Sequence, residues 1–291
     1  MLNRKTLVIF WFRWGALLLF PTALLAQSEK SDNFQTPLLE KIILDPVYAR
    51  EHSDYRFRTV EIGTLTLRDA YISPLRLEGS GFKLSFNHLR YTPQALKEFN
   101  TSIFSGIAID RAEDFNLMML NFGSNYSWQF PFWQKGTWKA YAGPWAQGYG
   151  NLRFALQNVN NILGYDAGLE LGATGRLEYK FKPGRKEFML TQQLSLPVIG
   201  AFVRPLYTFS GPILGETDQE VSIVQVGTLN RRFGWVYKAS LDFYRNRKHK
   251  RQIVAQVPYR ISYTFQYDQF SKPNSFQSVI QTLTFSKILK Y

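Results

Sequence analysis

Residues 165–181 alternate between two kinds of side chain, and this alternation limits the folds open to the chain. The odd positions are apolar or small, with an aromatic ring at each end, Tyr165 and Phe181. The even positions are glycine, polar or charged. A side-chain period of two belongs to a β-strand. The mean strand has only about five or six residues, so a longer one with an apolar and a charged face suits a membrane barrel.

The same alternation recurs at 118–130, 235–243 and 253–267. We therefore predict an all-β fold, a transmembrane antiparallel β-barrel of about twelve strands. Both chain ends are expected in the periplasm, which requires an even number of strands. Residues 187–209 are divided at Pro197 for this reason and because proline interrupts a strand. The predicted strands are 56–67, 80–91, 100–111, 115–130, 136–147, 164–181, 187–196, 199–209, 219–230, 234–244, 252–267 and 276–291.

The first 26 residues have the pattern of a secretory signal peptide. Arg4 and Lys5 precede the apolar run 14–26, and we expect cleavage before Gln27. A retained anchor is the alternative, but Arg13 leaves the apolar run short of a membrane span. Residues 27–55 are predicted to form an N-terminal periplasmic arm or plug, with a disordered linker as the alternative. Residues 56–291 form the predicted outer-membrane barrel.

Composition excludes several other classes of protein. Beyond residue 26 no apolar run approaches the roughly 20 residues of a membrane helix. The absence of cysteine excludes disulfides, thiolate chemistry and lipid attachment through cysteine. The net charge of +13 would allow binding to nucleic acid or anionic lipid. Basic clusters at the predicted turns 182–186 and 245–251 explain much of this charge, so we expect outer-membrane lipids and no nucleic acid as partners.

The last predicted strand has Leu283, Phe285, Leu289 and Tyr291 on one face, interrupted by Lys287. This end resembles the C-terminal signature by which bacterial outer-membrane barrels are recognised for insertion, although Phe is commoner than Tyr as the last residue. The resemblance implies an outer-membrane location and the barrel-assembly machinery as a partner. The segments 63–79 and 194–207 are similar to stretches in uncharacterised Gram-negative outer-membrane barrel families, for which no catalytic residues transfer.

The candidate catalytic residues are few. Outer-membrane acyl hydrolases pair a serine with a histidine base, and His88 is the weak candidate for that base. Alternation places it on the apolar face with Phe82, Leu84 and Phe86, where an interfacial histidine is the simpler interpretation. The chain has neither a G-x-S-x-G nucleophile motif nor an H-E-x-x-H zinc motif. No cofactor or metal site is therefore predicted, and an enzymatic role is the less supported alternative.

The predicted lumen carries balanced charges. Four acids and four bases lie on the polar faces of the clearest charged strands, and an ion-selective pore would show an excess of one sign. Balanced charges in a low-dielectric interior tend to pair. We therefore predict a structural or accessory barrel, or a small, largely occluded channel. The alternatives are an outer-membrane lipid-modifying enzyme and a secreted β-sandwich binding module. The predicted lumen charges are Asp166, Glu170, Arg176, Glu178, Lys180, Lys238, Asp242 and Arg260.

Overall fold

A computed structural model provides the structure of the chain. It describes residues 54–69, 73–110, 115–155, 163–184, 188–204, 224–229, 231–249, 252–271, 275–287 and 289–290. The predicted signal peptide, most of the predicted arm and Tyr291 lie outside these residues. Within the described part of the chain, no helix has the length and apolar character needed to cross a membrane.

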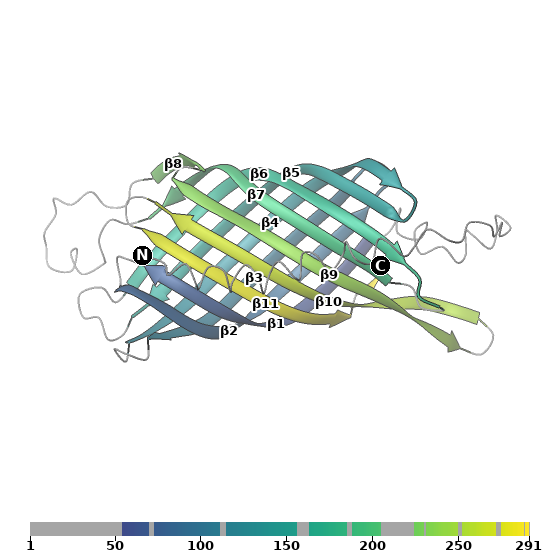
Figure 1. Ribbon diagram of the computed structural model, residues 1–291, viewed down its shortest axis with the longest axis horizontal. Helices are drawn as coiled ribbons and strands as arrows, with labels where there is room; N and C mark the ends of the chain where they lie inside the picture. Colours follow the sequence, from purple (N-terminus) through teal and green to yellow (C-terminus); the bar gives the residue numbers. More distant parts are fainter. Residues whose placement is uncertain are drawn as a thin grey trace, which may run out of the picture. The chain divides into compact units, whose positions relative to one another are not determined.

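Ten long strands form the wall of a barrel, and they run obliquely across Figure 1. Two short strands, β8 and β12, pair with β7 and β1 respectively. The strands are β1 Asp54–Asp69, β2 Ser73–Tyr91, β3 Leu96–Asp110, β4 Phe115–Lys135, β5 Trp138–Phe154, β6 Leu163–Phe181, β7 Phe188–Val203, β8 Val224–Thr228, β9 Arg232–His249, β10 Gln252–Phe270, β11 Phe276–Lys287 and β12 Leu289–Lys290.

The sheet closes on itself through β1. This strand pairs antiparallel with β2 on one side and with β11 on the other, where Glu61 lies opposite Thr284. Closure leaves no unpaired sheet edge among the long strands, which is the condition for a β-structure in a bilayer. The predicted transmembrane antiparallel barrel is confirmed, and the alternative of an open β-sandwich is wrong.

The predicted count of about twelve strands is corrected to ten in the wall. β7 continues through Pro197, which lies beside an irregularity where Leu171 pairs with Ile199 and Gly172 with Pro197. Bulges accept proline because the local ladder is already interrupted. β8 and β9 both pair with β7, so they occupy one position in the wall. The division at Pro197 was therefore wrong. The predicted strands 187–196 and 199–209 become one strand, and 219–230 and 234–244 correspond to two strands that share one position in the wall.

The two ends of the barrel differ in their connections. At the end that we call the turn end, strands are joined at residues 92–95, 136–137, 182–187 and 250–251. Gly136 and Gly184 have positive φ there, which glycine adopts without strain. At the opposite end, the loop end, the longest connections are 155–162 and 204–223. The connections 92–95, 182–187 and 250–251 thus lie at the same end of the barrel as the start of β1.

Burial follows the alternation seen in the sequence. On β6, Leu169 and Leu171 are 70% and 61% exposed, whereas Asp166 and Arg176 are 1% and 4% exposed. The apolar face therefore points outward and the charged face points into the lumen, as lipid requires. Aromatic rings stack on the outer face at the turn end, in two groups. They are Trp138, Tyr179, Phe181 and Phe188, and Phe243, Tyr259 and Phe285.

Candidate functional site

The barrel lumen contains three layers of inward side chains. A loop-end layer and a turn-end layer are almost fully buried, as shown by Arg153 at 1% and Asp242 at 0% exposure. Between them lies a central chamber, and about half of the polar side chains that line it are half-buried, such as Asn100, Asn125 and Gln147. The layers arise because inward positions carry different chemistry at different heights along the strands.

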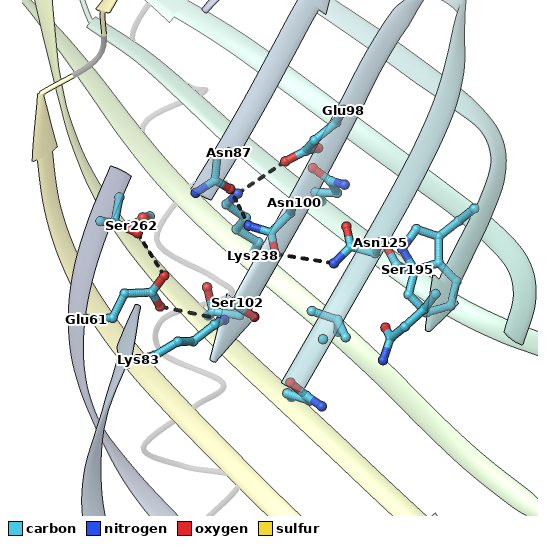
Figure 2. A pocket seen from close by; sticks show the side chains of 18 of the residues that line it. Glu61, Lys83, Asn87, Glu98, Asn100, Ser102, Asn125, Ser195, Lys238 and Ser262 are labelled. Carbon is cyan, nitrogen blue, oxygen red and sulfur yellow. Dashed lines mark hydrogen bonds and ion pairs between the residues drawn. The ribbon is translucent and has the colours of Figure 1, made fainter. Parts of the chain in front are cut away.

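The central chamber is a polar cavity of about 80 Å³, which suffices for several water molecules. Figure 2 shows its side chains, which come from strands on opposite sides of the barrel. Carboxamides form a chain across three strands, since Asn100 donates to Asn87 at 2.5 Å and accepts from Asn125 at 3.5 Å. The chamber is therefore lined mainly by neutral groups that both donate and accept hydrogen bonds.

The charges at the chamber wall are paired. Lys238 Nζ lies 3.3 Å from Glu98 Oε1, and this contact joins β9 to β3 across the lumen. Lys83 Nζ lies 3.8 Å from Glu61 Oε2 on the neighbouring strand. Glu61 also accepts hydrogen bonds from Ser85 at 2.8 Å and from Thr282 at 2.5 Å. Each carboxylate thus has a cation nearby, which lowers the cost of its burial.

In the loop-end layer, two arginines share one aspartate. Arg153 Nε lies 2.9 Å from Asp69 Oδ2, and Arg204 Nη2 lies 3.1 Å from Asp69 Oδ1. Arg153 also contacts Asp166, and Asn151 donates to the same carboxylate at 2.5 Å. These contacts connect β1, β5, β6 and the end of β7, so they cross the lumen between distant strands.

A second group in the loop-end layer centres on Arg232, at the start of β9. Its guanidinium contacts Glu170 and lies 2.9 Å from Asp268. It also stacks 3.8 Å from the ring centroid of Tyr149 and 4.8 Å from that of Phe270. Such desolvated cation–π contacts are among the stronger ones. An apolar cluster that includes Tyr149 and Phe270 fills the space around the charges.

The turn-end layer is built around Arg176. Its Nε lies 2.9 Å from Glu178, its Nη2 donates to the Tyr91 hydroxyl at 2.9 Å, and its Nη1 lies 3.6 Å from Glu98. The Tyr91 hydroxyl in turn donates to Glu178 at 2.8 Å. These contacts join β6 to β2 and β3 across the lumen. A buried cluster lies in the same layer and consists of Tyr55, Phe57, Leu89, Tyr91, Leu96 and Tyr141.

Arg260 forms the second ion pair of the turn-end layer. Its Nε and Nη2 donate to the two oxygens of Asp242 at 2.6 and 2.9 Å. This bidentate geometry is the strongest arrangement for the two groups. The guanidinium lies 5.1 Å from the ring centroid of Phe57. Charged and aromatic groups therefore fill this end of the lumen together.

Within the described strands, inward charges of opposite sign balance. Eight acids and five arginines are buried, and one acid and four lysines are half-buried at inward positions. The acids are Glu61, Asp69, Glu98, Asp110, Asp166, Glu170, Glu178, Asp242 and Asp268. The bases are Arg153, Arg176, Arg204, Arg232, Arg260, Lys83, Lys139, Lys180 and Lys238. The interior therefore has no excess of either sign among these residues.

The structure places the eight predicted lumen charges at inward positions of β6, β9 and β10. It brings together Arg176 with Glu178, and Asp242 with Arg260. Asp166, Glu170 and Lys238 pair instead with residues that sequence reasoning did not assign to the lumen, whereas Lys180 is half-buried near the end of β6. Those unassigned partners are Arg153, Arg232 and Glu98 respectively.

His88 lies outside the lumen, on the outward face of β2. Its Nε2 is 2.5 Å from Asp54 Oδ1, and both side chains are about one-third exposed, at 32% and 28%. The hydrogen-bond partner of the imidazole is thus a carboxylate of β1 and not a serine hydroxyl. Among the described residues, no group of three or more potential ligands is arranged to hold a metal ion.

A closed antiparallel wall, an apolar exterior and a charged interior define a transmembrane β-barrel. The chain belongs to the family "Protein of unknown function (DUF3316)", whose model matches residues 48–286. The expected resemblance to an uncharacterised outer-membrane barrel family is confirmed to this extent. The comparison with curated proteins gave no match.

Several solved structures are similar to this chain. The outer membrane protease OmpT from Escherichia coli is 6% identical, with 83% of this chain and 97% of that chain covered and a TM-score of 0.47. The translocator domain of the autotransporter NalP from Neisseria meningitidis is 9% identical, with 93% and 95% covered and a TM-score of 0.37. The outer membrane protein OprG from Pseudomonas aeruginosa is 9% identical, with 83% and 98% covered and a TM-score of 0.26.

Proposed function

We propose that this protein is an integral outer-membrane barrel with a structural or accessory role, and that its lumen is closed to bulk solutes. The observation that carries the proposal is the pair of buried, charge-paired layers at the two ends of the lumen. Each layer contains ion pairs between strands on different sides of the barrel, as in Arg153 with Asp69 and Arg176 with Glu98. A solute would have to displace these contacts and leave buried charges unpaired, which is costly.

Barrel size and charge balance support the same proposal. Barrels of about eight strands are filled by side chains, whereas those of sixteen or more leave a channel. The ten strands of this wall lie near the filled limit. A selective pore is lined by an excess of one sign, whereas the inward charges here balance.

Single-channel recording of the purified, refolded barrel in a planar bilayer tests the closed lumen. We expect no steady openings at moderate voltage and salt. Large and persistent porin-like openings would contradict the proposal. Brief, small openings would favour a second candidate, a small gated channel, which the half-buried polar side chains of the central chamber support.

We also propose that the turn end of the barrel faces the periplasm, and the location and orientation of the barrel are tested separately. We expect the protein in the outer-membrane fraction, with faster migration on gels before boiling than after it. The chain contains no cysteine, so single introduced cysteines report orientation without background. A membrane-impermeant maleimide should label Ser271→Cys at the loop end on intact cells, but not Lys135→Cys at the turn end. The reverse pattern would place the turn end outside.

We also propose that the barrel-assembly machinery recognises the C-terminal strand that ends at Tyr291. Truncation of this residue should lower the amount of heat-modifiable barrel in cells, while refolding of the purified chain in detergent stays efficient. Equal losses in cells and in detergent would indicate a folding defect and not a recognition defect.

A further inference from the structure

Basic side chains gather on the outer face of the barrel at the turn end of β1, β2 and β3. This basic patch consists of Arg56, Arg58, His88, Arg90 and Lys97. The strand register places its members side by side, with Arg56 opposite His88 and Arg90 opposite Lys97. Directly opposed residues in a sheet have Cβ atoms about 5 Å apart. The patch therefore presents several positive charges over a small area.

One acid accompanies the patch among the described residues of this face. Asp54 contacts Arg56 at 3.8 Å and His88 at 2.5 Å. Arg58 and Arg90 are exposed. The corresponding ends of β5, β6, β9 and β10 carry the stacked aromatic rings instead. The patch thus leaves positive charge at the membrane boundary, at the level where lipid phosphates lie.

An apolar groove of about 720 Å³ lies on the same outer face, over β3 to β8. Its floor is low because the outward residues of β5 are small, namely Ala146 and Gly148. Phe99 and Tyr126 form one wall, and Leu169 is among the aliphatic residues of the other. A groove of this kind on a lipid-facing surface fits a flexible hydrocarbon chain.

The basic patch and the groove are continuous along one row of paired residues. The row passes from Arg56 to His88 and then to Phe99, Tyr126, Ala146, Leu171 and Ile199. Five strand spacings of roughly 4.8 Å separate its second and last members, which gives about 24 Å.

The row also climbs from the membrane boundary into the bilayer. Phe99 is 3 residues from the turn-end start of β3, which begins at Leu96. Ile199 is 11 residues from the turn-end start of β7, which begins at Phe188. With strands tilted by roughly 40°, a row of this length rises about 15 Å, or half of the roughly 30 Å hydrocarbon core.

We propose that this surface binds one anionic phospholipid, with its phosphate on the basic patch and one acyl chain in the groove. The charge of the patch favours an anionic head group, and the row has the length and slope of a chain that spans one leaflet. The phospholipid, as opposed to lipopolysaccharide, follows from the proposed function, in which the turn end faces the periplasm and its phospholipid leaflet.

The head-group contact is tested by native mass spectrometry of the refolded full chain in micelles that contain equimolar phosphatidylglycerol and phosphatidylcholine. We expect one retained phosphatidylglycerol per barrel. The double variant Arg58→Gln with Arg90→Gln should lower this retention roughly thirtyfold, since each basic residue near anionic lipid contributes about a fivefold preference. The matched control, Lys135→Gln with Lys182→Gln, removes two charges from other turn-end positions and should retain lipid normally. Equal losses in the two double variants would overturn the proposal.

The acyl-chain contact is tested by filling the groove. Gly148→Leu adds bulk at a position where an added Cβ meets only the flexible side chain of Leu169, at 3.2 Å. Gly148→Leu should lower retention of both lipids while preserving the preference for phosphatidylglycerol. Gly175→Leu is the control, because an added Cβ there meets nothing within 4 Å and the site lies outside the groove. Unchanged lipid retention in Gly148→Leu would overturn the placement of the acyl chain in the groove.

Folding and membrane location are measured alongside lipid retention, so that a failure of this inference can be distinguished from a failure of the proposed function. Heat-modifiable migration confirms that each variant is folded. A barrel that resides in the outer membrane but retains no phospholipid contradicts only the inference. A barrel that retains phosphatidylglycerol but occurs outside the outer membrane contradicts only the proposed function. Retention of lipopolysaccharide in preference to phosphatidylglycerol would overturn the phospholipid as the occupant.

Discussion

The two end layers of the lumen differ sharply from the chamber between them. In the end layers, charged side chains are buried against aromatic rings, as Arg232 is against Tyr149 and Arg260 against Phe57. In the chamber, the lining is mainly carboxamide and hydroxyl groups, and many of these side chains remain half-buried. The same wall therefore encloses a tightly packed interior at two heights and a partly exposed, polar interior at one.

The difference shows what closes a barrel of this size. Long arginine side chains reach across the lumen and bring acids from distant strands together, so they fill space and satisfy charge at once. Short asparagines bond mainly to their neighbours along the wall, as Asn100 does with Asn87. They leave the axis open to water, which can satisfy their remaining donors and acceptors. The length of the side chains, as much as their polarity, therefore distinguishes the end layers from the chamber.

The largest expected effect is on the stability of the loop-end layer. Arg153→Met removes the guanidinium that contacts both Asp166 and Asp69. Breaking a buried ion pair from one side costs about 3–5 kcal/mol, because the remaining charge is left uncompensated. Urea-dependent unfolding of the refolded barrel, followed by tryptophan fluorescence, measures this loss.

Arg153→Lys is the matched control for that variant. It keeps the charge but loses the fork geometry that reaches two carboxylates, so its loss should be clearly smaller than that of Arg153→Met. A loss below about 1 kcal/mol in Arg153→Met would indicate that water already enters this layer, and the contrast with the chamber would fail.

A smaller effect is expected from a neutral side chain in the same layer. Asn151 is 5% exposed, donates to Asp166 at 2.5 Å and accepts from Asn121. Asn151→Ala leaves a buried carboxylate without this donor, which should cost about 1–3 kcal/mol. The same urea titration measures it. An unchanged free energy of unfolding would show that Asp166 does not need the hydrogen bond from Asn151 in addition to its contact with Arg153.

Much of the fold follows from the sequence because lipid imposes a simple rule on strands. The strict alternation of 165–181 reflects one face in hydrocarbon and one in the lumen, and β6 spans Leu163–Phe181. The sequence of a strand carries no comparable pattern that shows which strands it pairs with. The twelve-strand prediction went wrong at Pro197 for this reason, since a bulge and a strand break look alike without the neighbouring strand.

The lumen charges could be assigned to a face but not to their partners. Asp166 was placed by alternation, whereas Arg153 lies beyond the predicted strand 136–147 and was assigned to a loop. Asp69 and Asp268 were likewise placed just outside predicted strands, because the real strands are longer at the loop end. Contacts across the lumen join residues that are far apart in the sequence, such as Asp69 and Arg204. Only closure of the sheet brings them together.

The smallest expected effect on stability comes from the same change, asparagine to alanine, made in the chamber. Asn125 makes one long hydrogen bond, 3.5 Å to Asn100, and its side chain is half-buried in the chamber. Water can replace the lost carboxamide there, so Asn125→Ala should change the free energy of unfolding by no more than about 0.5 kcal/mol. The comparison with Asn151→Ala is therefore a direct measure of the difference between the layers. If both variants lose the same stability, the chamber is as dry as the end layers, and the interior is one continuous packed core.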